Sequence, residues 1–596
     1  MSEPAKLTAI TADAEGWPQA VAAVNDLLHE GATVLWATGP FEAEAKSGAA
    51  ISFEAGTFLV TEPSDRPMPD WHLRIRREFE VEPVALGSVD GFDGLTLRAS
   101  RIALYGGGGA PYNHAKIFAE LGFFVDFIGP REIRQGRLSG FDILVMPGGG
   151  GLGMIGQLEP LGEEGCRAIN DFVRAGGMYV GSCAGSYDAA RVPDSFLEVC
   201  PQQREMCLAN ALVWNRHDSE WVGLKSPGVG VLTSRTLRPD HPVMVGMPES
   251  FEITHYNGPL FEPGPDRLSD LSGITGLSAV AGFTDDFTPA EDFMAFGAFD
   301  RRRADETSLV AQAAAEGRFN VIAGDCGLGR VVLFGSHPEF GLDLGMDRWG
   351  TPARMLANAA FWQASYLTAS RSQHRATVPG AARSVPNGAG LDRVAGRLPA
   401  IADAVASLRA AALDNAPWLD DALAMSTFGL TGREIWTRSL AAFDGASETL
   451  RQTIEACRSA VGEARTLVGG LTKRKKTAAH LADALNEALG GLEDTIHYRV
   501  PPEWGQDYGH EGVLQMLDRT EAMLRKAHEN ADAEFEPSAN PYAHLGESPF
   551  QLVAGSYLAA VGIFTNARLL LQVHQYALEA AVRHGRRAES EMALAS

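Results

Sequence analysis

The hydrophobic and polar positions along the chain predict three regions of different structure. In residues 1–98, a helical stretch at 17–30 is followed by short apolar runs that are typical of strands, at 32–36, 49–54 and 57–60. This region is predicted to be a small α/β module. It contains no motif that indicates chemistry.

From residue 101 the pattern repeats as an apolar run, a glycine-rich turn and a helix. Strand-like runs lie at 101–105, 123–128, 141–146 and 178–182, and helical stretches lie between them at 113–121 and 161–175. Such alternation predicts a mostly parallel, doubly wound sheet with helices on both faces. Ligands of these sheets bind at the carboxyl ends of the strands. We assign residues 99–372 to this α/β domain.

Beyond this domain the sequence becomes rich in Ala, Leu, Glu and Arg. Residues 373–394 contain several Pro and Gly and predict a linker. Residues 395–596 are expected to form an all-α helical bundle, with helices at 399–413, 432–468, 477–492, 511–533 and 548–584. Ser548 and Pro549 favour the start of the last helix, and Gly585 favours its end. One buried stripe of this helix is expected to contain Tyr557, Val561, Phe564 and Leu571.

Length and charge limit the classes of protein to consider. The chain has 596 residues, which is too many for one hydrophobic core, so several domains are expected. Its net charge of −24 disfavours binding of nucleic acid. The short basic run at 473–476 is interpreted as a solvated helix face or turn.

Targeting and redox signals favour a cytoplasmic protein. The N-terminal residues contain no apolar stretch typical of a secretory signal, and the six cysteines form no CxxC pair. Residues 549–567 lack charge, but several polar residues interrupt them, so a buried bundle helix is expected there instead of a membrane span. Acidic and His pairs lack partners at metal-ligand spacing, so neither a metal nor a cofactor is expected.

The most informative motif is a cysteine between two glycines. Residues 178–182 form a predicted strand, and Cys183 follows with Gly181 and Gly185 on either side. A strand-to-helix turn this tight accepts only small neighbours and presents the nucleophile at a helix N-terminus, which stabilises thiolate. The backbone N–H of Ala184 is then expected to face the oxyanion of a tetrahedral intermediate.

Two glycine-rich turns follow neighbouring predicted strands. In the turn at 147–151, an amide of Gly148, Gly149 or Gly150 is expected to be the second oxyanion donor, because glycine lets the backbone approach the substrate. The earlier run at 106–109 lacks the GxGxxG spacing, so a dinucleotide site is excluded there.

A third motif follows the apolar run at 330–334, where the chain continues into His337-Pro338-Glu339. His and Glu two positions apart on a strand project to the same side. Glu339 is therefore expected to accept from one ring nitrogen of His337, while the other nitrogen faces Cys183.

At these residues the sequence resembles the class I glutamine amidotransferase-like superfamily. The run from Cys183 to Tyr187 is most similar to the branch of biotin-protein ligase N-terminal type. The segment His255-Tyr256-Asn257-Gly258-Pro259 is similar to a Tyr-Asn-Gly segment that this branch carries near its pocket. The resemblance covers about residues 100–345. It implies the fold, the Cys-His-Glu triad, and substrate contacts from Tyr187, Tyr256 and Asn257.

The sequence departs from glutamine-hydrolysing members at one position. These members carry a substrate-holding Gln where this chain has Tyr187, which argues against glutamine as the substrate. The sequence also lacks the Gly-Arg-Gly-type adenylate loop of a biotin ligase, so biotinylation is not implied.

Two hypotheses for function follow. The first is a thiol amidohydrolase or amidotransferase that acts on a small-molecule or peptide carboxamide through a thioester. The alternative is a non-catalytic binding or scaffold protein that keeps the amidotransferase-like fold and recruits partners through its helices. In either case the C-terminal helices are candidates for a protein partner or for self-association. No interaction with nucleic acid or membrane is expected.

Overall fold

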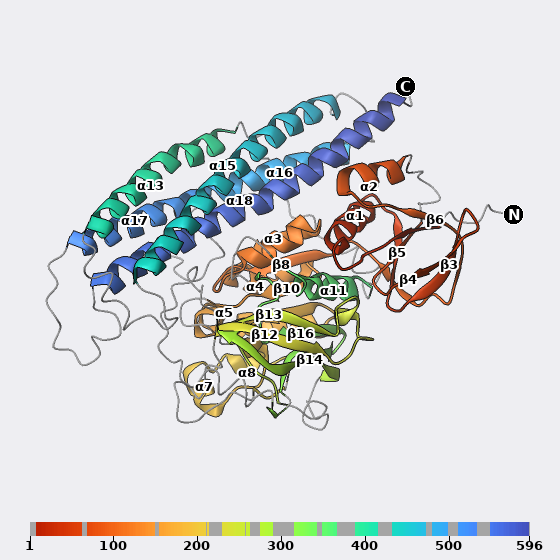
Figure 1. Ribbon diagram of the computed structural model, residues 1–596, viewed down its shortest axis with the longest axis horizontal. Coiled ribbons are helices and arrows are strands. Elements are labelled where there is room, and N and C mark those ends of the chain that lie inside the picture. Colours follow the sequence, from red (N-terminus) through yellow and green to blue (C-terminus); the bar gives the residue numbers. More distant parts are fainter. Residues whose placement is uncertain are drawn as a thin grey trace. The chain divides into compact units, whose positions relative to one another are not determined.

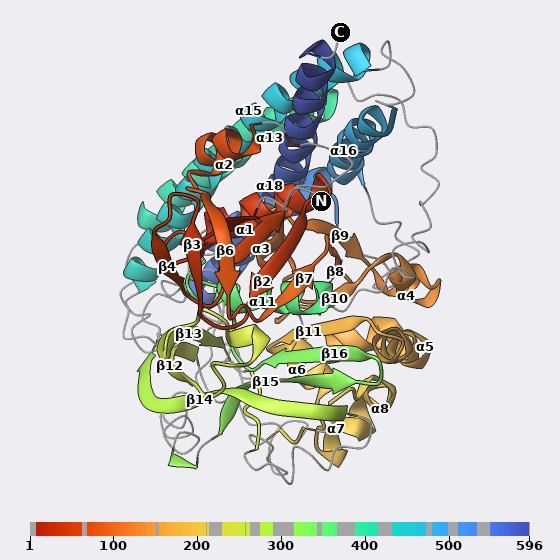
Figure 2. The same ribbon diagram turned by 90° about the vertical axis from the view of Figure 1, so that its right-hand side faces the viewer.

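The structure is a computed structural model. It describes residues 7–61, 68, 70–149, 154–209, 211–213, 229–256, 258–262, 274–289, 315–316, 318–341, 349–365, 388–414, 432–471, 479–498, 511–532 and 549–594. The chain divides into two compact units (Figures 1 and 2). The first contains the described residues up to 365, and the second contains those from 388 onward. Each unit is treated by itself.

An antiparallel sheet forms the N-terminal part of the first unit. Its strand order is β4-β3-β6-β1-β5-β2-β7. The strands are β1 (Leu7–Ile10), β2 (Thr33–Ala37), β3 (Phe41–Ala45), β4 (Ala50–Phe53), β5 (Phe58–Thr61), β6 (Val84–Asp90) and β7 (Gly94–Leu97), and the helices are α1 (Trp17–His29) and α2 (Trp71–Phe79). Alternating buried and exposed positions, as in β3, place one face of the sheet on a small apolar core.

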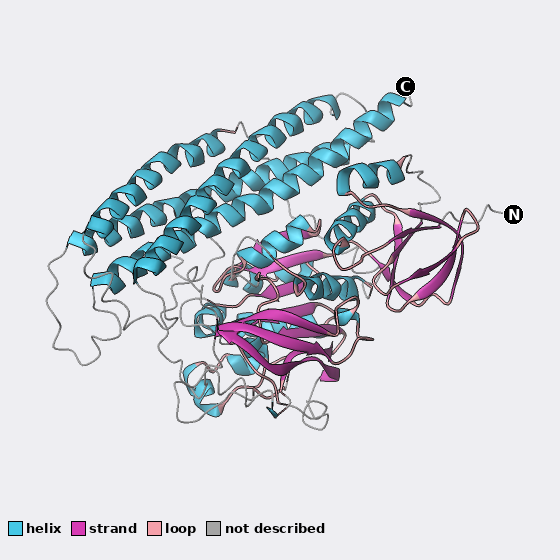
Figure 3. Ribbon diagram, in the orientation of Figure 1, coloured by secondary structure: helices cyan, strands magenta, loops and turns pink. Residues whose placement is uncertain are grey.

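The second sheet of this unit has the order β13-β12-β14-β15-β16-β11-β10-β8-β9. Its strands are β8 (Arg101–Tyr105), β9 (Phe124–Ile128), β10 (Ile143–Met146), β11 (Met178–Ser182), β12 (Val229–Thr236), β13 (Ser250–Tyr256), β14 (Ile274–Pro289), β15 (Phe319–Cys326) and β16 (Gly329–Phe334). The accompanying helices are α3 (Tyr112–Glu120), α4 (Pro130–Arg134), η1 (Arg137–Gly140), α5 (Met154–Arg174), α6 (Ala184–Ala189), α7 (Asp194–Val199), α8 (Gln203–Met206), η3 (Pro242–Met244) and α11 (Ala353–Ala364). Figure 3 shows the strands of this part in magenta with helices in cyan beside them.

The expectation of a mostly parallel sheet holds for only part of it. Strands β9, β8, β10, β11 and β16 pair in parallel, whereas β13, β12, β14, β15 and β16 pair antiparallel. The reason is local at β15–β16, where Gly327 adopts a φ of +63° in a two-residue connection. A connection this short can only reverse the chain into a hairpin, and parallel pairing requires a long crossover.

The two sheets of the first unit share contacts through α11. The ring of Phe361 packs against Trp36 and Phe58, with centroids 5.7 and 5.4 Å apart. Arg354 donates through Nη2 to the carbonyl oxygen of Ala12 at 2.8 Å, and Asn25 donates through Nδ2 to that of Leu121 at 2.7 Å. The predicted module at 1–98 is therefore packed against the region that follows it.

The second unit is helical. Its described helices are α13 (Ala389–Asp414), α15 (Gly432–Leu471), α16 (Ala479–His497), α17 (Val513–Asp532) and α18 (Pro549–Leu594). The predicted stripe on α18 is confirmed, because Tyr557, Val561, Phe564 and Leu571 are all buried. Helix α13 begins within the predicted linker, most of which lies outside the described residues, as does the basic run at 473–476.

The predicted end of the last helix at Gly585 is wrong, since α18 continues to Leu594. A Cβ at Gly585 would lie 3.1 Å from Leu485 and 3.2 Å from Leu467. This glycine therefore allows close packing against α16 and α15, and it does not cap the helix. None of the described helices is long and apolar enough to cross a membrane.

Candidate active site

Cys183 lies in the turn between β11 and α6 with a φ of 49° and a ψ of −110°. Positive φ is uncommon for a residue with a side chain, and it persists where the surroundings enforce it. A Cβ on Gly185 would lie 2.3 Å from the carbonyl oxygen of Met146, and one on Gly181 would lie 2.6 Å from that of Gly185. Both flanking glycines are therefore required by close backbone contacts, as the sequence predicts.

His337 and Glu339 form a buried pair in the turn after β16. The Nδ1 atom of His337 lies 2.7 Å from Oε1 of Glu339. The strand ends at Phe334, so the two side chains meet across a turn and not along an extended strand as expected. The backbone N–H of His337 donates to the carbonyl oxygen of Thr254 at 2.8 Å, and the ring of Phe340 stacks on the imidazole at 4.5 Å.

The electrostatics of this pair favour an imidazolium. Burial by itself lowers the pKa of His337, but the charges of Glu339 and Cys183 outweigh it and raise the pKa to about 10. Burial conversely opposes ionisation of Glu339, and the neighbouring histidines nevertheless lower its pKa. With Cys183 ionised, these two negative charges therefore favour the imidazolium, which is the state that follows transfer of the thiol proton to His337.

Gly148 brings Cys183 and His337 together. A Cβ at this position would lie 2.5 Å from Cε1 of His337 and 2.8 Å from Cβ of Cys183, so both side chains lie against the same glycine. In the described part of the chain, the buried Nε2 atom of His337 has no hydrogen-bond partner. The thiol of Cys183 also lies 3.2 Å from the carbonyl oxygen of Tyr256 and can donate to it.

The other predicted site residues are placed as follows. Ala184 is the first residue of α6, where a backbone N–H has no acceptor within the helix. The carbonyl of Gly148 accepts from the N–H of Ala110 at 2.9 Å, and Gly149 follows with a φ of +71°. In a trans peptide the N–H points opposite to the C=O, so the Gly149 N–H points away from Ala110.

Three predicted substrate contacts differ in where they lie. Tyr256 approaches the site with both its carbonyl and its ring, which is 6.3 Å from that of His337. Tyr187 is buried in the hydrophobic core cluster that also contains Tyr105 and Leu144, a placement typical of a core residue. Gly150 and Asn257 lie outside the described residues.

The sequence reasoning missed one ionisable neighbour of the pair. His114 on α3 is completely buried, and its Nε2 lies 3.4 Å from Oε2 of Glu339 and 3.0 Å from Oγ of Ser182. No local pattern marks this histidine, because it sits in an ordinary helical stretch. Only the packing of α3 behind the strand ends reveals it.

A second buried ionisable group is Asp188 on α6. It is completely buried, and neither carboxyl oxygen has a hydrogen-bond partner in the described part of the chain. Burial, followed by the charge of Cys183, raises the pKa of Asp188 well above its usual range. The folded protein therefore keeps this side chain protonated at pH values where the unfolded chain ionises it.

We expect Asp188→Asn to improve stability progressively as pH rises. The pKa of Asp188 is higher in the folded state than in the unfolded state, so the folded state keeps a proton that the unfolded state releases. At pH values above the unfolded-state pKa, Asp188 therefore lowers the free energy of unfolding. Over that range the free energy of unfolding of the variant should rise relative to that of wild type by about 1.4 kcal/mol per pH unit, until the pKa of Asp188 in the folded state is reached. Urea unfolding of both proteins between pH 5 and 8 measures this, and parallel curves would contradict it.

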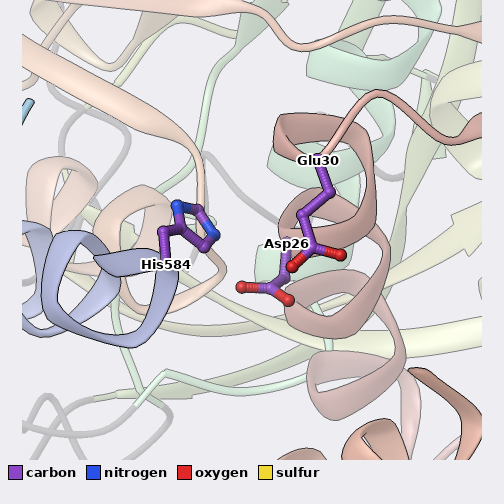
Figure 4. A group of neighbouring side chains, drawn as sticks. All are labelled: Asp26, Glu30 and His584. Carbon is purple, nitrogen blue, oxygen red and sulfur yellow. The ribbon is translucent and has the colours of Figure 1, made fainter. Parts of the chain in front are cut away.

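A pair of carboxylates lies away from this site. Asp26 and Glu30 are one turn apart on α1 (Figure 4), and Arg74 of α2 approaches them at 3.3 and 2.7 Å. Arg74 thus neutralises part of their charge within the first unit. His584, also drawn in Figure 4, belongs to the helical unit.

Comparison with known proteins found a solved structure and a family model that are similar to parts of this chain. A solved structure similar to the chain is a glutamine amidotransferase from Thermotoga maritima, at 12% identity and a TM-score of 0.23, covering 41% of this chain and 78% of that one. A search of curated proteins found no match. A family model described as "Biotin-protein ligase, N terminal" matches residues 138–199, the stretch that contains β10, β11 and Cys183, and the chain is similar to that family over this segment.

Proposed function

We propose that the chain is a thiol amidohydrolase or amidotransferase of the class I glutamine amidotransferase-like type, with Cys183, His337 and Glu339 as its catalytic triad. The observation that carries the proposal is the convergence of Cys183 and His337 on Gly148, with Oε1 of Glu339 2.7 Å from Nδ1 of the imidazole. The substrate class is a small-molecule or peptide carboxamide. The region similar to the biotin-protein ligase family supports the amidotransferase-like fold.

The reaction begins with transfer of the thiol proton. In the resting thiol, Cys183 donates to the carbonyl of Tyr256. When the proton moves to Nε2 of His337, Glu339 stabilises the resulting imidazolium through Nδ1. The thiolate then attacks the carboxamide carbon, and the carbonyl π electrons move to oxygen.

The oxyanion is held by backbone donors. The N–H of Ala184 at the start of α6 is the first donor, and the N–H of Gly149 is the second. Collapse of the intermediate expels ammonia, which takes its proton from His337, and leaves a thioester on Cys183. His337 then removes a proton from water, which hydrolyses the thioester to a carboxylate and restores the thiol.

Selective alkylation tests the nucleophile directly. Burial raises the pKa of Cys200 and Cys457 to about 12 and that of Cys207 to about 11, and it also raises the pKa of Cys166 and Cys326. These five thiols remain protonated near neutral pH and are poor nucleophiles. We expect iodoacetamide at pH 7 to modify Cys183 at least about tenfold faster than any of the others, read by mass spectrometry of each peptide.

The outcome decides between the two hypotheses for function. Equal modification of all six cysteines would favour the non-catalytic scaffold. If Cys183 reacts selectively, ammonia release from a panel of primary carboxamides that includes glutamine identifies the substrate class. The Cys183→Ala variant provides the blank for that assay.

A further inference from the structure

Glu339 has a second neighbour that the triad does not use. Its Oε1 faces His337 at 2.7 Å, and its Oε2 lies 3.4 Å from Nε2 of His114. That separation is too long for a well-formed hydrogen bond, but both side chains are buried, so the interaction is poorly screened by solvent. The carboxylate is therefore placed between two imidazole rings.

The chemistry of the carboxylate decides the tautomer of His114. The neighbouring histidines lower the pKa of Glu339 against the effect of burial, so Oε2 can only accept a hydrogen bond. Burial lowers the pKa of His114, with the Glu339 charge only partly offsetting it, so His114 is neutral near pH 7. A neutral ring that faces a carboxylate carries its single proton on the facing nitrogen, here Nε2.

Ser182, the residue before the nucleophile, lies next to this nitrogen. Its Oγ lies 3.0 Å from Nε2 of His114, and Ser182 immediately precedes Cys183 at the end of β11. The N–H of His114 therefore points between the hydroxyl beside the nucleophile and the carboxylate that orients the base. Among the described titratable groups, Cys183 and His255 also act on His337, and burial lowers the pKa of His255 to about 3.

We propose that His114 is a positioning residue of the active site: its Nε2–H holds Oε2 of Glu339, which turns Oε1 toward His337. This inference rests on the proposed function, because it assigns His114 a role in the same triad. His114 touches neither substrate nor the reacting atoms, and it acts only through Glu339. Loss of the Nε2–H frees the carboxylate to rotate and leaves the imidazolium less well supported.

Two amide side chains separate this role from simple filling of space. In His114→Gln the amide nitrogen can occupy the place of Nε2, whereas in His114→Asn it can occupy only the place of Nδ1. We expect His114→Asn to slow alkylation of Cys183 at pH 7 about ten- to hundredfold and to move the midpoint of the rate–pH curve to higher pH. We expect His114→Gln to stay within about threefold of wild type, since it keeps the donor.

The control is His574→Asn, which alters a half-buried histidine on α18 and should leave the alkylation rate unchanged. Thermal unfolding verifies that each variant is folded. Wild-type reactivity at His114→Asn, or equal slowing by the folded Gln and Asn variants, overturns the proposal. If Cys183 of wild type is alkylated no faster than the other cysteines, the result contradicts the proposed function itself.

A second measurement does not depend on whether the variants fold. Nitrogen-15 NMR of histidine-labelled wild type reports which ring nitrogen of His114 carries the proton. The signal of His114 is assigned by its absence from the spectrum of His114→Gln. If that variant is unstable, selective labelling of the preceding residue provides the assignment. The proposal requires the Nε2-protonated tautomer between pH 6 and 8. Protonation at Nδ1 overturns it.

Discussion

Replacing Cys183 with serine is expected to abolish thioester formation while the chain stays folded. The two side chains are similar in size, so the strained turn with its φ of 49° can be retained. A serine hydroxyl is much harder to deprotonate than a thiol, and removal of a triad nucleophile costs on the order of 10⁴- to 10⁶-fold in turnover. Hydrolysis of the carboxamide found in the substrate panel, together with intact-mass detection of an acyl-enzyme, measures the effect.

Cys207→Ser provides the matched control, because Cys207 is a partly exposed thiol outside the site. It should keep full activity and the same melting temperature as wild type. If Cys183→Ser keeps its turnover, another residue is the nucleophile. If wild type forms no acyl-enzyme, the result favours the non-catalytic scaffold hypothesis.

Replacing Gly148 with alanine is the second change expected to have a large effect. The new Cβ would lie 2.5 Å from Cε1 of His337 and 2.8 Å from Cβ of Cys183, well inside van der Waals contact. The two side chains must move apart, and a displacement of about 1 Å in a catalytic pair costs about hundredfold in rate. Relief of the overlap should also cost about 1–3 kcal/mol of stability.

Gly140→Ala tests whether any glycine substitution in this region would do the same. No heavy atom lies within 4 Å of a Cβ built at Gly140, which belongs to η1 of the same unit. We expect its alkylation rate at Cys183 to equal that of wild type. If Gly148→Ala also reacts at the wild-type rate, Cys183 and His337 do not meet at this glycine in solution.

Several features of the site follow from short stretches of sequence. The apolar run before Cys183, with glycine on both sides, is enough to predict a strand, a tight turn and a short helix, because steric limits on a turn act between adjacent residues. The two-residue spacing of His337 and Glu339 likewise predicts their contact, which the structure forms at 2.7 Å.

Other features depend on neighbours that are remote in sequence. The glycine run at 106–109 has no ligand-binding pattern, yet a Cβ on Gly109 would lie 2.8 Å from Pro147 and 2.9 Å from the carbonyl oxygen of Gly148. Gly109 therefore packs closely against the glycine turn at 147–151. Three other features were missed for the same reason: the antiparallel half of the large sheet, the burial of the Asp188 carboxyl and the close helix packing at Gly585. Each depends on which segment comes to lie opposite.

The sequence by itself determined the local form of the site: a strained cysteine turn and a His-Glu pair, each produced by sterics and hydrogen bonding within a few residues. Only the tertiary structure decided that they meet. Strands β11 and β16 are far apart in the chain but pair in parallel, with Ser182 opposite Phe334. Parallel pairing places both carboxyl ends at one edge of the sheet, so the residues that follow, Cys183 and then His337, emerge side by side. The same packing places His114 of α3 behind Glu339, and no local pattern could specify that contact.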